Sequence, residues 1–246
     1  MKQLLLTTCI LLGLFATAQQ SGKISYDEVT QMEINFPEGM EVPEGFEMPT
    51  ENVAKKVLLF NAKESLYKNL PQEPVVNEIK SEGFHLEIKN DIPEDEYYKN
   101  TDKGSKVEKR DFLDRTFLMK GDIKDFKWKI APDQKKVLDY VVQKATTTMD
   151  TLEVIAWFTP QLQISNGPDK FGNLPGMILE VEIPGLNRVI TAKEITLGDV
   201  EEPIVAPNKG KKVSDEEFEK IRAEKLAEMR AQYGGKGGVF IQTIEN

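Results

Sequence analysis

The chain has 246 residues, with 41 acidic and 32 basic side chains and a formal net charge of −9. This acidity argues against nucleic acid or an anionic membrane surface as a partner. The single cysteine, Cys9, lies in an apolar amino-terminal run that we expect to be removed, which excludes disulfides, thiolate catalysis and thiolate metal sites from the mature chain.

The amino terminus predicts a secretory signal peptide, segment 1–18. Lys2 gives it a basic start, Leu4 to Phe15 is almost entirely apolar, and small residues end at Ala18. The run is too short to cross a bilayer, and no later stretch is apolar for long enough. We expect cleavage after Ala18 and a periplasmic or secreted mature chain, 19–246, that forms one β-rich domain without a membrane span.

Alternating apolar and polar residues from Ile24 to Ile34 predict a half-buried strand. The segment 35–52 then repeats a six-residue unit that starts at Pro37 and again at Pro43. Proline, glycine and glutamate at this density predict a long loop.

Short apolar runs separated by turn residues predict an antiparallel sheet through most of the remaining chain. Two hairpin turns are expected, at Lys120–Asp122 and at Pro184–Asn187. The expected strands are Lys56–Asn61, Ser65–Asn69, Gly83–Lys89, Asp111–Met119, Phe126–Ile130, Lys136–Thr147, Thr151–Phe158, Met177–Ile183 and Arg188–Leu197.

The carboxyl-terminal part predicts the only helix. A proline- and lysine-rich linker, 201–213, leads to Ser214, which with Glu217 forms a capping box. Apolar residues then recur at helical period until Gly234, and the predicted helix packs its apolar stripe on the sheet. Residues 239–244 predict a closing strand. The fold class is therefore mainly β: a large curved antiparallel sheet, half-barrel or sandwich-like, with one amphipathic helix near the C-terminus.

The residues most constrained by backbone geometry lie between the strands ending at Phe158 and beginning at Met177. Pro175 and Gly176 fit the two central positions of a type II turn, where proline presets φ and glycine takes a positive φ. This predicts a structural corner between two core strands. The alternative is that the loop binds a ligand.

This region resembles the GLPGLI family of Bacteroidetes, which implies a secreted or periplasmic β-rich domain of unassigned role. Two departures from the motif preserve its geometry: Asn173 tolerates a left-handed backbone, and Met177 conserves the volume of leucine. Val142 stands where many members carry a cysteine, so thiol chemistry is not expected. The residues that carry the resemblance, expected to be structural, are Trp128, Lys144, Ala156, Trp157, Pro160, Gly167, Pro168, Leu174, Pro175 and Gly176.

Residues that carry chemistry are scarce. His85 is the one histidine, and with Glu87 on the same strand face it supplies too few ligands for structural zinc. No Gly-x-Ser-x-Gly elbow or phosphate-binding glycine loop is present, and the acidic pairs fall in loops or at the expected start of the helix. We therefore expect no catalytic residue, no metal site and no cofactor.

Three methionines around the first loop raise a weaker hypothesis of copper(I) binding. Met32, Met40 and Met48 recur at even spacing, and thioethers suit that ion. The alternative is that Met40 and Met48 are apolar anchors of the six-residue repeat.

The sequence favours a non-catalytic envelope protein over an enzyme. Our first hypothesis is a binding or accessory module for an outer-membrane or surface system, acting through a sheet edge or a concave face. The alternative is a carrier of a small hydrophobic molecule or lipid on that concave face, lined by the aromatic residues around Trp128 and Trp157. Those aromatics are expected to build the core.

Overall fold

The computed structural model describes residues 21–31, 33–35, 50–72, 75–81, 84–90, 93–233 and 240–242. The expected signal peptide, Cys9, Met32, Met40, Met48 and residues 36–49 of the expected loop lie outside them. The elements are β1 (Gly22–Gln31), β2 (Glu33–Asn35), β3 (Glu51–Phe60), β4 (Glu64–Asn69), β5 (Val75–Ser81), β6 (Phe84–Asn90), β7 (Glu96–Asn100), β8 (Ser105–Phe112), β9 (Arg115–Asp122), β10 (Lys129–Val137), β11 (Tyr140–Met149), β12 (Leu152–Thr159), β13 (Met177–Ile183), the 3₁₀ turn η1 (Pro184–Leu186), β14 (Arg188–Leu197), β15 (Lys211–Val213), α1 (Asp215–Tyr233) and β16 (Phe240–Gln242).

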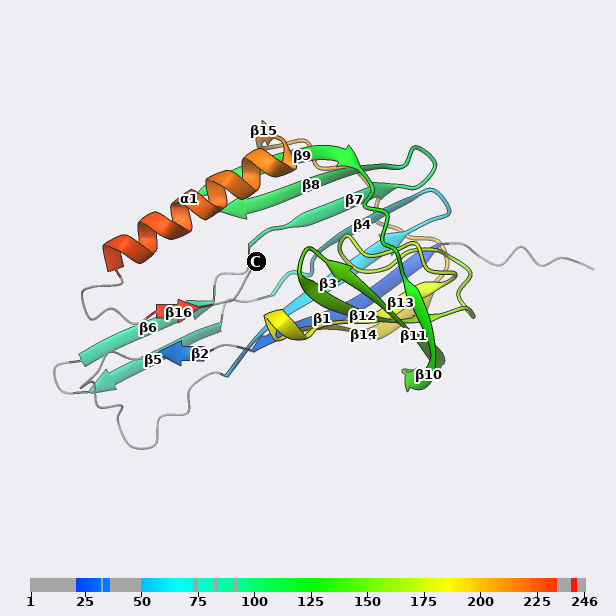
Figure 1. Ribbon diagram of the computed structural model, residues 1–246, viewed down its shortest axis with the longest axis horizontal. Helices are drawn as coiled ribbons and strands as arrows, with labels where there is room; N and C mark the ends of the chain where they lie inside the picture. The colour runs from blue at the N-terminus through cyan, green and yellow to red at the C-terminus, as the bar shows by residue number, and fades with distance from the viewer. Residues whose placement is uncertain are drawn as a thin grey trace, which may run out of the picture.

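One open sheet of twelve strands dominates the described chain, in the order β10-β11-β12-β13-β14-β1-β3-β4-β7-β8-β9-β15 (Figure 1). Neighbouring strands are antiparallel except β9 and β15, which are parallel. Two small two-stranded sheets, β5-β6 and β2-β16, lie beside it. The expected mainly β fold with a carboxyl-terminal helix is confirmed, and the parallel pair corrects the expectation of a purely antiparallel sheet.

The two faces of the sheet carry different residues because side chains alternate along each strand. On one face, which we call the inner face, a row of directly paired residues crosses five strands and changes from apolar to charged. On the other, the outer face, lie their sequence neighbours, such as Glu96 and Lys109. The inner row is Ile24, Leu58, Tyr67, Tyr97 and Glu108.

The main core lies on the apolar half of the inner face. The loop between β12 and β13 packs there through Leu162, Phe171 and Leu174, all buried. Tyr26 of β1 donates from its hydroxyl to the carbonyl of Ile178 at 2.7 Å, which joins the loop's end to the sheet centre. The expectation that the aromatics build the core is confirmed: Phe126 and Phe158 are buried here too, and the two tryptophans pack partly buried against the cluster.

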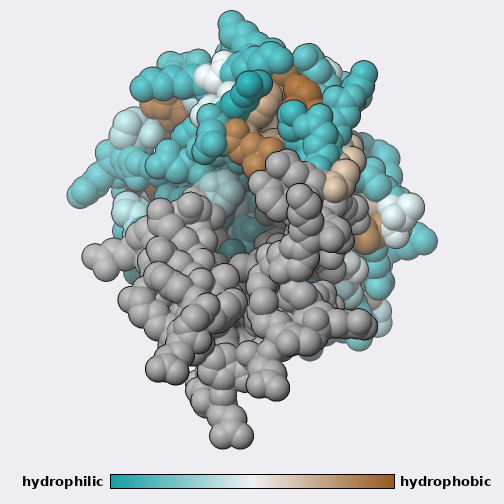
Figure 2. All heavy atoms as spheres, turned by 90° about the vertical axis from the view of Figure 1, so that its left-hand side faces the viewer, coloured by the Kyte–Doolittle hydropathy of each residue, from teal (hydrophilic) through white to brown (hydrophobic). Residues whose placement is uncertain are grey.

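Among the described residues, helix α1 packs on the sheet through its first turns. Its cap forms as expected, because the Glu217 N–H donates to Ser214 Oγ at 3.1 Å. Phe218 is buried against Phe117 of β9 at a ring separation of 5.3 Å. The start of α1 lies near β9 and β15 (Figure 1). Further along, Met229 is 37% exposed. The surface at the top of the molecule, where α1 lies, is mostly hydrophilic with small apolar patches (Figure 2).

The expected turn at Lys120–Asp122 is wrong, because these residues belong to β9. The hairpin instead turns at Leu113 and Asp114, with φ of 47° and 57°, inside the expected strand 111–119. Leu113 is 46% exposed, so its apolar character predicted a strand where the chain reverses. Leu138, with φ 53°, likewise breaks the expected strand 136–147.

The turn at Pro184–Asn187 is confirmed as the connection between β13 and β14. Asn187 ends it in a left-handed conformation with φ 49°. The expected linker 201–213 ends in β15, which the sequence did not predict, and Glu202 forms an ion pair with Lys68 of β4. The strands β5, β7 and residues 105–110 of β8 were also not predicted.

Candidate functional site

The charged half of the inner face forms a buried cluster beneath the β12–β13 loop. Alternate residues of β7 and β8 face inward, so Lys99 pairs with Lys106 and Tyr97 with Glu108 in the ladder. The loop adds Asp169 and Lys170. We call the following set the inner charged cluster: Glu28, Lys56, Asp95, Lys99, Lys106, Glu108, Arg110, Asp169, Lys170, Arg188 and Asp215.

Asp169 lies at the centre of this cluster and is only 4% exposed. Its carboxylate lies 3.9 Å from Arg110 Nη2 and 3.6 Å from Arg188 Nη2. Burial raises the pKa of Asp169, but the charges of Lys170, Arg110 and Arg188 outweigh burial and hold the pKa well below its usual range. The carboxylate is therefore ionised, and it is paired with Arg110 of β8 and Arg188 of β14.

Lys99 of β7 ties the loop to the sheet. Its ammonium donates to the carbonyls of Gly167 and Phe171, both at 2.9 Å, and the residue is 2% exposed. Burial lowers the pKa of Lys99 to about 7, with Asp169 opposing that shift. Lys99 thus spans the middle of the loop with two hydrogen bonds.

Several of the remaining inner charges form ion pairs. Arg188 donates to Glu28 at 2.9 Å, and Arg110 donates to Glu108 at 2.7 Å and to Asp95 at 2.8 Å. Burial raises the pKa of Glu28 and of Glu108, yet the neighbouring cations lower both below the usual value. These ion pairs hold the loop in place, although Asp169 Oδ2 and Arg188 Nε are buried and form no hydrogen bond among the described residues.

The motif residues identified in the sequence divide between the two faces. Trp128 donates from Nε1 to the carbonyl of Gly172 at 2.8 Å and so touches the loop. Trp157 lies on the outer face, where its Nε1 donates to Glu182 at 2.7 Å, and Lys144 Nζ lies 6.0 Å from its ring centre. Ala156, on the opposite face of the same strand, is fully buried in the core.

Within the loop, Gly167, Pro168, Leu174 and Gly176 are buried, whereas Pro160 and Pro175 are exposed.

At Gly176 the backbone of the loop lies close to the backbone at the end of β12. Its φ is 151°, and a Cβ added there would lie 2.1 Å from the carbonyl oxygen of Thr159. The positive φ agrees with the expected turn, but its N–H donates to the carbonyl of Leu174 at 2.8 Å. That bond closes a three-residue γ-turn at Pro175 rather than the expected type II turn. Asn173 adopts the left-handed conformation, with φ 64°.

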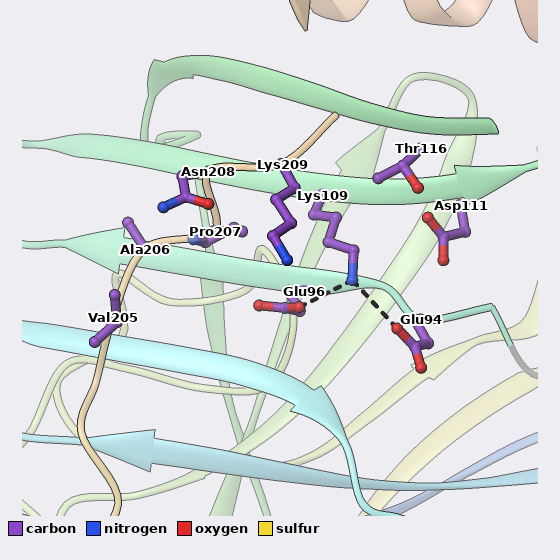
Figure 3. A pocket seen from close by; sticks show the side chains of 10 residues that line it. All are labelled: Glu94, Glu96, Lys109, Asp111, Thr116, Val205, Ala206, Pro207, Asn208 and Lys209. Carbon is purple, nitrogen blue, oxygen red and sulfur yellow. Dashed lines mark hydrogen bonds and ion pairs between the residues drawn. The ribbon is translucent and has the colours of Figure 1, made fainter. Parts of the chain in front are cut away.

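A second group of polar residues lines a cavity of about 520 Å³ on the outer face (Figure 3). The sheet supplies the floor, and the segment that runs toward β15 supplies the opposite wall. Lys109 and Lys209 both point into the cavity, and Asp111 lies beside Thr116 (Figure 3). The lining residues are Glu94, Glu96, Lys109, Asp111, Thr116, Val205, Ala206, Pro207, Asn208 and Lys209.

The charges of this outer pocket are only partly compensated. Lys109 is shared by Glu96 at 3.1 Å and Glu94 at 3.4 Å. Asp111 Oδ1 is buried and accepts no hydrogen bond from any described residue. Lys209 takes part in none of the ion pairs or hydrogen bonds found within the described ranges. One buried carboxylate oxygen and one exposed ammonium therefore have no hydrogen-bond partner among the described residues.

Sequence reasoning missed both sites. A signal was present in β8, where the run from Lys106 to Asp111 places charged residues on both faces of one strand. A strand with ionised side chains on both sides needs partners from elsewhere in the chain. Asp169 and Lys209, the partners that complete the two sites, come from distant loops and carry no comparable signal. His85 and Glu87 lie on β6, whose side chains are outside the described residues.

Comparison with known proteins finds one family model and two solved structures to which the chain is similar. Residues 74–217 match the family model described as N-glycanase peptide, N-terminal domain. Two structures of PNGF-II, in space groups P2₁ and C2, match 82% of this chain with a TM-score of 0.52 and 14% identity. The chain spans about a third of their length, 33% and 32%. At this identity the likeness shows the fold alone. No curated protein matches the chain.

The family match overturns the GLPGLI resemblance. The residues that carried the resemblance, such as Trp128, Leu174 and Gly176, are set by the packing of a loop on a sheet. Indole, proline and glycine at such a corner satisfy general packing and backbone demands. They were therefore weak markers of one particular family.

Proposed function

This chain belongs to the N-glycanase peptide, N-terminal domain family, and we propose that it acts as a non-catalytic binding or accessory module. In this proposal it works beside a catalytic or surface-assembly unit and holds a peptide-borne glycan substrate or a protein partner of that unit. The coverage supports this division of labour, because the fold of this chain accounts for about a third of the PNGF-II chain.

The observation that carries the proposal is the contrast between the two groups of charges. Glu28, Glu108 and Asp169, the buried acids of the inner face, each have cationic partners. In the outer pocket, Asp111 Oδ1 accepts no hydrogen bond from a described residue, and Lys209 forms no ion pair among the described residues. Paired internal charges support a scaffold, and unpaired groups in a cavity support binding.

The hydrophobic-carrier hypothesis receives less support from the fold. The apolar half of the inner face, where a lipid was expected, is filled by Leu162, Phe171 and Leu174 of the chain's own loop. A ligand there would have to displace a loop that Lys99 holds with two hydrogen bonds. We therefore propose the binding module ahead of the carrier.

Export remains part of the proposal. The apolar start and the Ala18 cleavage site support a periplasmic or secreted protein, although segment 1–18 lies outside the described residues. Within the described part of the chain, no helix has the length and apolar character needed to cross a membrane.

The test combines two measurements on the full exported chain. Mass spectrometry of an N-glycopeptide incubated with the protein should show the glycan still attached, and calorimetry should detect binding of that glycopeptide. Release of the glycan would establish an enzyme and contradict the proposal. Absence of binding would remove the module hypothesis, and a lipid found by native mass spectrometry would replace it with the carrier.

A further inference from the structure

The outer pocket is built from two parts of the chain that are far apart in sequence. Glu96 of β7, Lys109 and Asp111 of β8 and Thr116 of β9 form the floor, and residues 205–209 form the wall. The Lys68–Glu202 ion pair holds the start of that wall segment to β4, and the pairing of β15 with β9 holds its end. Because both ends are attached, the cavity is part of the fold.

The pocket offers one negative and one positive group for which the described residues supply no hydrogen bond: Asp111 Oδ1 and the exposed Lys209. Asp111 Oδ1 is buried at the floor, and leaving a buried carboxylate oxygen without a donor is costly. Lys209 extends from the wall toward the cavity (Figure 3). Lys109, in contrast, is engaged by Glu94 and Glu96 and is not available.

The rest of the wall is apolar or neutral. Val205 is 59% exposed, and Ala206 and Pro207 follow it in the lining. These groups can contact small aliphatic side chains, while Asn208 and Thr116 can hydrogen-bond to amide groups. The cavity volume of about 520 Å³ lies within the range of pockets that hold small molecules.

We propose that the outer pocket binds a short peptide segment that carries both a cationic amine and a carboxylate. The amine donates to Asp111 beside Thr116, and the carboxylate accepts from Lys209. This inference rests on the proposed binding function and names the ligand class of its site. It assigns the unpaired groups by charge: an amine alone would leave Lys209 without a partner, and a carboxylate alone would leave Asp111 without a donor.

Calorimetric titration of the full chain with alanine peptides tests the proposal. Trialanine carries both charges, acetyl-trialanine lacks the amine, and trialanine amide lacks the carboxylate. Di- and tetra-alanine vary the distance between the charges by about 3.5 Å per residue. We expect trialanine or one of its length variants to bind, and loss of either charge to weaken binding about tenfold or more.

Protein variants complete a matched cycle. Asp111→Asn should weaken binding of the free-amine peptide about tenfold and should not weaken the acetylated peptide further. Lys209→Met should weaken binding of the peptide with a free carboxylate about tenfold and should not weaken binding of the peptide amide further. Lys127→Met is the control, because Lys127 is exposed, pairs with Asp125 and does not line the pocket. Unchanged thermal melting of each variant shows that the fold is retained.

Several outcomes would overturn the proposal. The first is that none of the peptides binds. The second is that the capped peptides bind as tightly as trialanine. The third is that the losses caused by a peptide cap and by the matching protein variant add up. Tighter binding of N-acetylglucosamine than of the peptides would assign the pocket to a neutral polyol instead. If no alanine peptide binds and no glycan is released, only the peptide proposal fails and the accessory role is unaffected. If the glycan is released, the accessory role is contradicted, whatever the peptide titration shows.

Discussion

The inner charged cluster and the outer pocket use the same residue types on the same strand with different results. Along β8, Glu108 and Arg110 point inward, and Lys109 and Asp111 point outward. Inward, the β12–β13 loop brings Asp169 and closes the set of charges. Outward, the segment 205–209 approaches but leaves a cavity. The covering segment, rather than the residue type, thus separates a structural cluster from a binding site.

The largest expected effect tests how closely the β12–β13 loop packs on the sheet. Gly176→Ala would place a Cβ 2.1 Å from the Thr159 carbonyl oxygen, at a φ of 151°. We expect a loss of about 3 kcal/mol or more in the free energy of unfolding, measured by urea denaturation. Gly104→Ala is the matched control, because Gly104 also has a positive φ, 64°, but no atom within 4 Å of its Cβ position. Its loss should stay near 1 kcal/mol.

The second prediction compares one aspartate from each site. Asp169→Asn removes a buried charge between two arginines and should lower the free energy of unfolding by about 3 kcal/mol. Asp111→Asn, in the outer pocket, should change it by less than about 0.5 kcal/mol, because Asp111 Oδ1 accepts no hydrogen bond from a described residue and Asp111 acts on Lys109 only through space. Similar losses in the two variants would mean that both carboxylates are structural and would remove the contrast.

The third prediction uses pH. Burial lowers the pKa of Lys99 to about 7, whereas in the unfolded chain it titrates near 10.4. Between these values the unfolded chain binds more protons, so the contribution of Lys99 to stability rises with pH, by at most about 1.4 kcal/mol per unit. Below pH 7 its destabilisation is complete and constant. The difference in stability between wild type and Lys99→Met should therefore grow in favour of wild type from pH 7 to 10.

Lys109 is the outer counterpart in the pH experiment. Glu96, Asp111 and Glu94 outweigh partial burial and raise the pKa of Lys109. Its stabilising contribution is thus fully present below its ordinary pKa and is lost only as pH rises through the higher folded value. The wild type and Lys109→Met should differ by a constant amount from pH 7 to 9. A slope for Lys109 equal to that of Lys99 would contradict the assignment.

The smallest expected effect concerns the wall of the outer pocket. Lys68 and Glu202 form a partly exposed ion pair, with side chains 26% and 52% exposed. A double-mutant cycle of Lys68→Ala and Glu202→Ala should give a coupling of about 0.5 kcal/mol that decreases at high salt. A larger coupling that resists salt would indicate that the wall is held as firmly as the inner loop.

The fold class was predictable because it rests on local patterns. Period-two alternation located β1, apolar runs between turn residues located β13 and β14, and the Ser214 cap located the start of α1. The hairpin at Leu113 and Asp114 was not predictable, because the turn places an exposed leucine in a left-handed conformation. β15 was hidden in a lysine-rich run because its pairing with β9 is decided by tertiary contact.

The sites were less predictable than the fold. Gly176 was identified because positive φ leaves a local signature in the sequence. Asp169 stands next to Pro168 in the same motif and was read only as a loop residue, because the arginines that give it a role are 59 and 19 positions away. The outer pocket depends on how residues 205–209 pass over three strands, which a linker composition does not reveal.

The pairing of β1 with β14 constrains the order in which the protein assembles. Gly22 lies opposite Leu197, so the strand that leaves the ribosome early finds one of its two neighbours only after almost the whole sheet has been synthesised. Contacts between such distant segments slow folding, and unpaired strand edges expose a nascent chain to aggregation. We expect truncations before β14 to yield insoluble protein, because β1, β13 and the loop between β12 and β13 then lack the strand that joins them.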